Sequence, residues 1–136
     1  MVASATAENA AGSKGAPVVY LVDDEPLLIG LGEALLQSDG YLTRAFQDPE
    51  SAWKSFLSEE VKPRLLVSDF SMGGTMTGLE LMERCKRADP TLKTLLVSGS
   101  VTTGELQQKP SSVDAFLPKP YKAADFVSAV RRLLAV

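Results

Sequence analysis

The chain has no histidine, a single cysteine and no long apolar run. The missing histidine removes the commonest general base and metal ligand, and with Cys85 alone a zinc site is improbable. A single cysteine cannot form an internal disulfide, which fits a reducing cytoplasm. No apolar stretch approaches the ~20 residues of a membrane span. These absences favour a cytoplasmic protein that does not enter a membrane.

Positive charge is also scarce. The chain has 14 Lys and Arg against 17 Asp and Glu, for a net charge of -3. Proteins that bind nucleic acid usually carry clustered positive charge to contact the phosphates, and this chain has a net negative charge. We therefore expect no direct nucleic-acid binding. With 136 residues and 45% hydrophobic content, the chain is long and apolar enough for one domain. Residues 1–16 are small and polar and predict a flexible lead-in or linker before a domain at 17–136, with no output domain after it.

Short apolar runs alternate with helix-like segments along the domain, and each run has the length of a buried strand. Strands are predicted at residues 18–22, 41–46, 65–69, 92–98 and 113–117, and helices at 26–38, from 48, at 78–88, at about 105–108 and at 122–135. The alternation of five strands with five helices predicts a doubly wound α/β domain with a parallel sheet. The strand at 41–46 is expected at an edge.

Three of these helices carry apolar residues at helical spacing, and for the second we expect them to face inward. The residues are Leu27, Leu28, Leu31 and Leu35 in the first helix, Ala52, Trp53, Phe56 and Leu57 in the second, and Phe126, Val127, Val130, Leu133 and Leu134 in the last. We assign Trp53 and Cys85 to the core.

Charged residues follow three of the predicted strands. The first strand is followed by Asp23 and Asp24, the third ends at Asp69, and the fifth is followed, after a proline, by Lys119. Carboxyl ends of parallel strands form one rim, where open α/β sheets bind ligands. Three carboxylates at one place repel one another and require a cation, and a hard, oxygen-liganded ion such as Mg²⁺ suits them best.

Each of these residues has a plainer interpretation when taken alone. An acidic pair after a strand often caps the next helix, a single aspartate is usually a loop carboxylate, and a single lysine is usually solvated. Their joint occurrence at strand ends, in this order, is what favours a functional site.

Four short motifs now point to a known family. They are Val22-Asp23-Asp24-Glu25-Pro26, Ser68-Asp69 with Met72 downstream, Leu96-Val97-Ser98-Gly99 and Lys119-Pro120-Tyr121. Over about residues 18–136 the chain resembles a response-regulator receiver domain of two-component signalling. The resemblance implies a flavodoxin-like, five-stranded sheet in the order 2-1-3-4-5.

The resemblance also implies roles for individual residues. Asp69 would accept a phosphoryl group from a sensor histidine kinase or phosphotransfer protein, and Lys119 would neutralise charge beside it. Mg²⁺ would be held by Asp23, Asp24, Asp69 and the backbone carbonyl of Ser71. Ser98 would offer its hydroxyl to the phosphoryl group and, with Phe116, act as a switch. Because the donor histidine belongs to the partner, a histidine-free chain is consistent with this scheme.

Two further expectations concern the backbone. The resemblance implies a cis peptide bond between Lys119 and Pro120. The family usually has proline after the methionine and a glycine eight residues after the aspartate; here Gly73 replaces that proline and Gly78 lies nine residues after Asp69. The loop is therefore one residue longer. We also expect the helix at about 105–108 to be shorter and more mobile than its neighbours.

Three other interpretations remain open at this point. The domain would also suit a phosphorylation-silent interaction or dimerisation module, or the C-terminal receiver of a hybrid sensor kinase. An enzyme such as a haloacid-dehalogenase-like phosphatase is disfavoured, because that family has a second aspartate where this chain has Ser71. We therefore expect a phosphoacceptor, not an enzyme, with at most slow loss of its own phosphoryl group.

Overall fold

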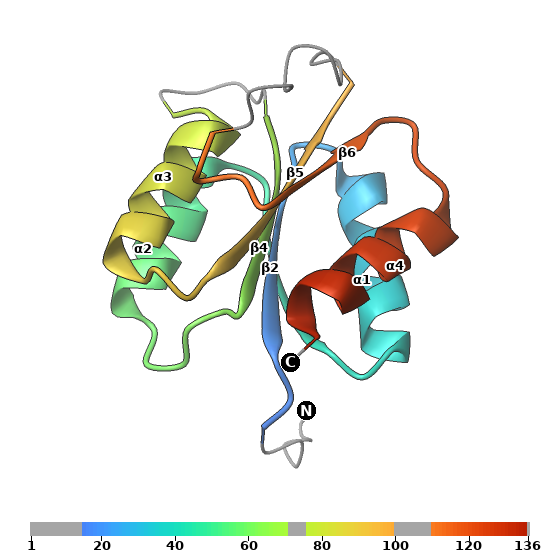
Figure 1. Ribbon diagram of the computed structural model, residues 1–136, viewed down its shortest axis with the longest axis horizontal. Helices are drawn as coiled ribbons and strands as arrows, with labels where there is room; N and C mark the ends of the chain where they lie inside the picture. Colours follow the sequence, from blue (N-terminus) through green and yellow to red (C-terminus); the bar gives the residue numbers. More distant parts are fainter. Residues whose placement is uncertain (1–14, 71–75, 100–109, 136) are drawn as a thin grey trace.

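A five-stranded parallel sheet forms the centre of the molecule (Figure 1). The computed structural model describes residues 15–70, 76–99 and 110–135. Its strands are β2 (Val18–Val22), β3 (Leu42–Phe46), β4 (Leu65–Asp69), β5 (Lys93–Ser98) and β6 (Ala115–Pro118). They lie in the order β3-β2-β4-β5-β6, which is 2-1-3-4-5 in chain order and confirms the predicted topology.

The strands differ in burial as their sequences predict. Every residue of β4 is buried, and so are all but one residue of β2 and of β5, because helices cover both faces of the sheet. In contrast, β3 lies at an edge, as expected, and has no buried residue. The buried strands β2 and β4 therefore hold Asp23, which follows β2, and Asp69, which ends β4, in fixed positions.

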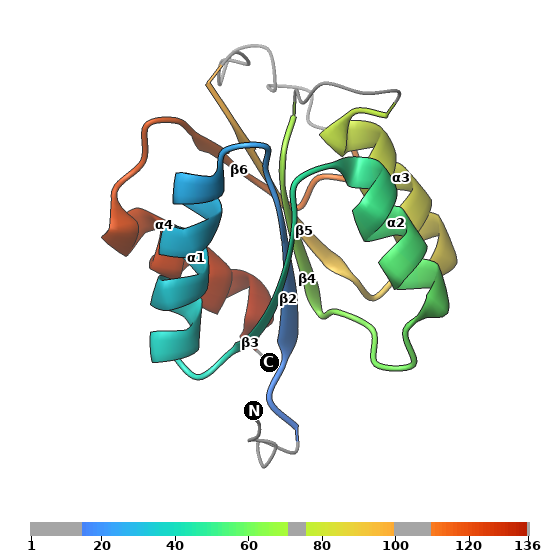
Figure 2. The ribbon, with the colours of Figure 1, turned by 180° about the vertical axis from the view of Figure 1, so that it is seen from behind.

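Two helices cover each face of the sheet (Figures 1 and 2). The helices described are α1 (Pro26–Ser38), α2 (Pro49–Ser58), α3 (Gly78–Ala88) and α4 (Ala123–Leu134). One core cluster packs with α2 and α3, and the other packs with α1 and α4. The helix predicted at about 105–108 lies outside the described residues. None of the helices in the described ranges is long and apolar enough to span a bilayer.

Local signals explain where the helices begin. The Asp48 carboxylate accepts a hydrogen bond from the Ser51 backbone N–H at 2.7 Å, and Pro49 occupies the first turn of α2. At the start of α3, Thr77 and Glu80 form a reciprocal capping box, with bonds of 3.1 and 2.8 Å. The capping box fixes the residue at which α3 begins, shortly after Asp69 in the sequence.

The leucine stripe of α1 does not form its buried face. The buried residues are Ile29, Gly32 and Leu36, whereas Leu27 is 86% and Leu31 is 48% exposed. The reason is close approach: a Cβ built on Gly32 would lie 3.3 Å from a methyl group of Leu21 on β2. The helix therefore lies close to the sheet on its glycine side, and leucines are left at the surface.

The inward face predicted for α2 is only partly confirmed. Ala52 and Phe56 are buried, but Leu57 is 58% exposed, because successive helix residues point about 100° apart and Phe56 faces the core. Trp53 is partly buried rather than fully inside. Cys85 is 1% exposed, which confirms its assignment to the core.

Candidate functional site

The three aspartates meet at the carboxyl rim of the sheet. Val22 of β2 is in register with Ser68 of β4, so the residues that follow them, Asp23 and Asp69, lie side by side. Carboxylate oxygens of Asp23, Asp24 and Asp69 lie within 4.8 Å of one another. The structure thus brings together the three residues that the sequence predicted to converge.

Lys119 reaches the same rim from β6. Its Nζ donates hydrogen bonds to Oδ2 of Asp23 at 3.0 Å and to Oδ2 of Asp69 at 3.3 Å. Its backbone N–H donates to the Ser98 carbonyl at 2.9 Å, and the peptide bond between Lys119 and Pro120 is cis, as predicted. The Lys119 side chain is therefore fixed between the carboxylates of Asp23 and Asp69, which are distant from it in the sequence.

Burial makes the charges at this rim interact strongly. Asp23 and Asp69 are each 9% exposed, whereas Asp24 faces solvent. Burial raises the pKa of Asp69, the charge of Asp23 raises it further, and Lys119 only partly opposes both effects. Burial alone would lower the pKa of Lys119, but its hydrogen bonds to Asp23 and Asp69 and their charges raise it. Lys119 is thus held as an ammonium.

The donor set fits a hard divalent cation. Three carboxylates face one ammonium, so the rim carries excess negative charge that a cation would neutralise. The Glu25 backbone N–H donates to Oδ1 of Asp23 at 3.0 Å and helps to orient that carboxylate. Clustered carboxylate oxygens with an open, solvent-facing side are what Mg²⁺ prefers. Ser71, whose carbonyl was the fourth predicted ligand, lies outside the described residues.

The two predicted switch residues lie on one face of the sheet. Ser98 is 1% exposed and ends β5, next to the strand that carries Asp69. Phe116 is in register with Leu96, two residues before Ser98, and paired residues point to the same side. Phe116 is partly buried and packs against the core cluster beside α2 and α3. Both residues therefore face the side of the sheet that α2 and α3 cover.

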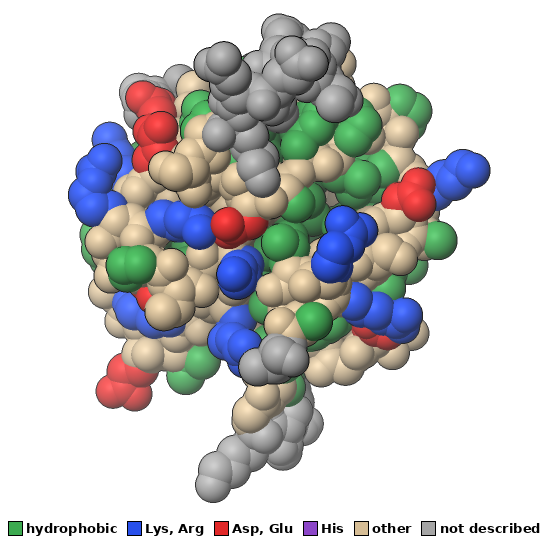
Figure 3. All heavy atoms as spheres, viewed as in Figure 1, with side chains coloured by type: hydrophobic (Ala, Val, Ile, Leu, Met, Phe, Trp, Pro, Cys, Tyr) green, Lys and Arg blue, Asp and Glu red, His purple; other side chains and the backbone are tan. Residues whose placement is uncertain are grey.

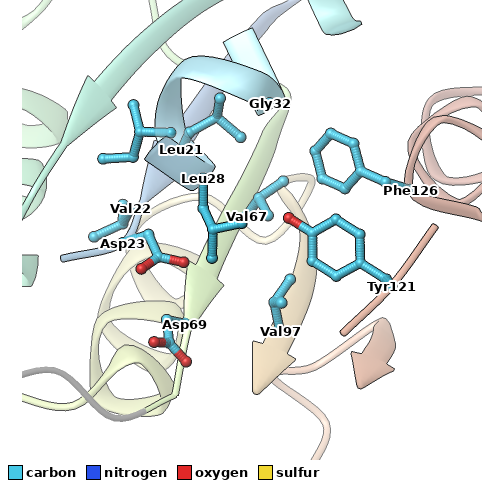
Figure 4. A pocket seen from close by; sticks show the side chains of 11 residues that line it. Leu21, Val22, Asp23, Leu28, Gly32, Val67, Asp69, Val97, Tyr121 and Phe126 are labelled. Carbon is cyan, nitrogen blue, oxygen red and sulfur yellow. The ribbon is translucent and has the colours of Figure 1, made fainter. Parts of the chain in front are cut away.

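Tyr121 belongs to the Lys119-Pro120-Tyr121 motif, but its position beside Asp23 and Asp69 was not predicted from the sequence. Figure 4 shows its hydroxyl pointing into a small cavity that Asp23 and Asp69 also border. The cavity holds about 20 Å³, enough for one water molecule. The Tyr121 ring stacks on Phe126 at 5.5 Å, and burial raises the pKa of its hydroxyl, with both carboxylates adding to the rise and Lys119 opposing it.

Gly78 supports the backbone that presents Asp69, a function the sequence analysis did not assign. Its N–H donates to the Phe70 carbonyl at 2.9 Å, and a Cβ at this position would lie 1.9 Å from the Asp69 carbonyl oxygen. The Ser68 hydroxyl donates to that same carbonyl at 2.9 Å. The start of α3 is thus packed directly against the end of β4.

Comparison with known proteins agrees with the site and the fold. The family model for the response regulator receiver domain matches residues 19–131. The nitrogen assimilation regulatory protein NtrX of Azorhizobium caulinodans is 30% identical over 119 residues, covering 85% of this chain and 26% of that protein. The DNA-binding response regulator MtrA of Mycolicibacterium smegmatis is 26% identical, over 85% of this chain and 50% of that protein. The chain belongs to the response regulator receiver domain family.

Solved structures of relatives show the same architecture. NtrX from Brucella abortus is 27% identical with a TM-score of 0.78, over 88% of this chain and 27% of that one. TrrA from Thermotoga maritima, solved in complex with Mg²⁺–BeF, is 25% identical with a TM-score of 0.74, over 87% and 99%. A receiver protein from Sinorhizobium medicae, at 24% identity and a TM-score of 0.79, shares the fold. The chain spans half or less of the curated relatives it matches.

The raised pKa of Asp69 predicts a pH dependence of stability. The folded protein retains the Asp69 proton above the unfolded value near 3.8, so this group's stabilising contribution is lost as pH rises through the folded pKa. The measurement is urea unfolding of wild type and of Asp69→Asn without divalent metal, between about pH 4 and about pH 8. As the pH increases, the free energy of unfolding should rise more, or fall less, in Asp69→Asn than in wild type.

Comparison with the variant isolates Asp69 from other groups. Asp114 contributes the opposite slope, because its hydrogen bond to Lys86 lowers its pKa although burial would raise it. That group is the same in both proteins. Parallel pH profiles for wild type and Asp69→Asn would show that the Asp69 pKa is not raised.

Proposed function

We propose that the chain is a phosphorylatable receiver in which Asp69 accepts a phosphoryl group from a phosphohistidine of a sensor kinase or phosphotransfer protein. The observation that carries this proposal is the convergence of Asp23, Asp24 and Asp69 with Lys119 at one rim of the sheet. A carboxylate oxygen of Asp69 attacks phosphorus, the O–P bond forms, the P–N bond breaks, and the imidazole leaves. The chain needs no histidine of its own for this step.

Catalysis of such a transfer consists mainly of positioning and charge neutralisation. The Lys119 ammonium already lies 3.3 Å from Asp69 and would follow the incoming phosphoryl oxygens. Bound Mg²⁺ would supply positive charge to the transferring group, and Asp23, Asp24 and Asp69 would hold it. The complex of the related TrrA with Mg²⁺–BeF supports this proposal.

The conformational change that signals phosphorylation would involve Ser98 and Phe116. A phosphoryl group at Asp69 attracts the Ser98 hydroxyl from the neighbouring strand, and Phe116 occupies the space that is released. This is a population shift caused by one local charge event. Beyond phosphate acceptance and its slow hydrolysis, we propose no enzymatic turnover, and we propose a cytoplasmic location. DNA binding is named for MtrA, of which this chain spans 50%, and is not extended to this chain.

The test is intact-mass spectrometry after incubation with acetyl phosphate and Mg²⁺. One phosphoryl adduct is expected, and chelation of Mg²⁺ with EDTA should prevent it. Reduction of the acyl phosphate with borohydride should yield homoserine at position 69 in the peptide map. If neither acetyl phosphate nor a phosphorylated phosphotransfer protein gives an adduct with Mg²⁺ present, the phosphorylation-silent module becomes the better account.

An exposed apolar surface beside the site suits the phosphodonor. Leu27 and Leu31 are exposed on α1, and an open hollow of about 390 Å³ is lined by Leu28, Leu31, Lys119, Pro120 and Tyr121. Exposed apolar patches mark interaction sites, and this one borders the lysine that contacts Asp69. We propose that the donor protein docks here and so places its phosphohistidine over the acidic group.

Leu31→Asp should therefore separate the two kinds of phosphodonor. Transfer from a phosphorylated histidine phosphotransfer protein should slow by about 10-fold to 100-fold, the effect of losing one important apolar contact. Labelling by acetyl phosphate should not change, because the small molecule needs no docking surface. Leu57→Asp, at a similarly exposed leucine on the other side of the sheet, is the matched control. Equal rates for both variants would exclude this surface as the docking site.

A further inference from the structure

Away from the acidic rim, the C-terminal half of α3 carries two exposed arginines, Arg84 and Arg87. Neither Arg84 nor Arg87 forms an ion pair or hydrogen bond with any residue that the structure describes, whereas Lys86 between them pairs with Asp114 at 2.8 Å. Arg84 and Arg87 are three positions apart and therefore neighbours on one helix face. Two adjacent guanidinium groups are thus available in a chain whose net charge is -3.

These arginines border an open hollow between α2 and α3. It measures about 420 Å³ and is lined by Trp53, Arg84, Arg87 and Ala88. The Trp53 ring lies nearly parallel to that of Phe56, with centroids 6.0 Å apart, and Trp53 lines the hollow together with the two arginines. Indole surface beside guanidinium groups suits a ligand that combines apolar surface with negative charge.

Arg87 also borders a second hollow. It measures about 470 Å³ and is lined by Glu83, Lys86, Arg87, Pro110, Ser111 and Ser112. The Ser112 hydroxyl has no hydrogen-bond partner among the residues that the structure describes, although Ser112 is only 8% exposed. Figure 3 shows Lys and Arg side chains, with Asp and Glu among them, over the part of the surface where α3 lies in Figure 1. The two hollows share Arg87 in their lining.

We propose that this α3 surface, defined as Trp53, Arg84, Arg87, Ser111 and Ser112, binds an extended acidic segment of a partner protein. Carboxylates of the segment would pair with the two guanidinium groups, and an apolar side chain between them would pack on Trp53.

The shape of the surface favours a peptide over a nucleotide. Small-molecule sites usually enclose most of their ligand, but both hollows are open, and the first offers no amide or hydroxyl to orient a base. Two open hollows that share Arg87 instead suit an extended chain. The chain's own residues 1–14 contain one acid, Glu8, and one base, Lys14, so they do not supply the complementary charge.

The α3 surface is separate from the apolar surface on α1. Helices α2 and α3 cover one face of the sheet, and α1 and α4 cover the other (Figure 2). An acidic partner on α3 would therefore leave Lys119 and Leu31 accessible, so both surfaces can be occupied together.

Trp53 is the only tryptophan in the chain, so its fluorescence reports directly on this surface. The probe is the synthetic peptide Glu-Leu-Glu-Glu-Leu-Glu, which does not fluoresce, with a matched peptide carrying Gln in place of Glu. The acidic peptide should change the Trp53 emission saturably, with a Kd of roughly 10–100 μM that weakens with salt. The double variant Arg84→Gln/Arg87→Gln should bind about 10-fold or more weakly, whereas Arg132→Gln, exposed on α4, should bind like wild type.

Both arginines are exposed, so the double variant should fold normally, which circular dichroism checks. No saturable change, equal binding of the Gln peptide, or unchanged binding by the double variant would overturn the proposal. A saturable response to AMP in place of the peptide would assign the surface to nucleotides. Concentration-dependent dimers that the double variant abolishes would assign it to a second copy of the chain. Either of these results would also overturn the proposal.

Discussion

Asp69→Asn is expected to abolish the phosphoryl adduct, from acetyl phosphate and from a phosphorylated phosphotransfer protein alike. The neutral amide is a far weaker nucleophile than the carboxylate, and neither Asp23 nor Asp24 can replace Asp69. The Asp23 carboxylate is held by Lys119 and by the Glu25 backbone N–H. The exposed Asp24 has no ammonium within ion-pair distance among the described residues. Intact-mass spectrometry with Mg²⁺ present measures the loss. Near-complete absence of adduct is expected under conditions that label wild type fully.

The variant should fold, because Asn is nearly isosteric with Asp and removes one of three clustered negative charges. Asp125→Asn, at an exposed aspartate on α4, is the matched control and should be labelled like wild type. An adduct of undiminished yield in Asp69→Asn would show that phosphate is accepted elsewhere, and the proposed chemistry at this rim would then be wrong.

Gly78→Ala is expected to have the largest effect on stability. The added Cβ would lie 1.9 Å from the Asp69 carbonyl oxygen, 2.9 Å from the Asp69 carbonyl carbon and 2.7 Å from the Ser68 hydroxyl oxygen. Two of these contacts are with backbone at the end of β4, which cannot move without disturbing the central sheet. We expect a loss of about 3 kcal/mol or more, and a fall in Tm on the order of 10 °C by circular dichroism.

Gly30→Ala is the matched control, because a Cβ there would have nothing within 4 Å. Gly30 lies inside α1, where alanine is favoured over glycine by roughly 0.5–1 kcal/mol, so this variant should be slightly more stable than wild type. A Gly78→Ala protein with the Tm of wild type would mean that the start of α3 is not packed against Asp69 as described. Reduced labelling of the folded Gly78→Ala protein would follow from displacement of Asp69.

Much of the fold and of the acidic group could be predicted from the sequence. Apolar runs such as 65–69, long enough only for strands and separated by helical patterns, require a parallel sheet covered on both faces. Parallel strands end at one rim, so Asp23 and Asp69 had to meet once their strands were neighbours. That neighbourhood, and the cis bond before Pro120, were implied by resemblance to the family rather than by any local pattern.

Only the tertiary structure decided which parts of the helices face outward. Helical spacing marks apolar positions, but the close approach at Gly32 determined that α1 turns Leu27 and Leu31 to solvent. In the same way, Trp53 is an apolar residue in sequence, yet the distance between α2 and α3 leaves part of its ring beside Arg84. Local sequence determines which side chains can be buried, whereas the packing of elements distant in sequence determines which of them are.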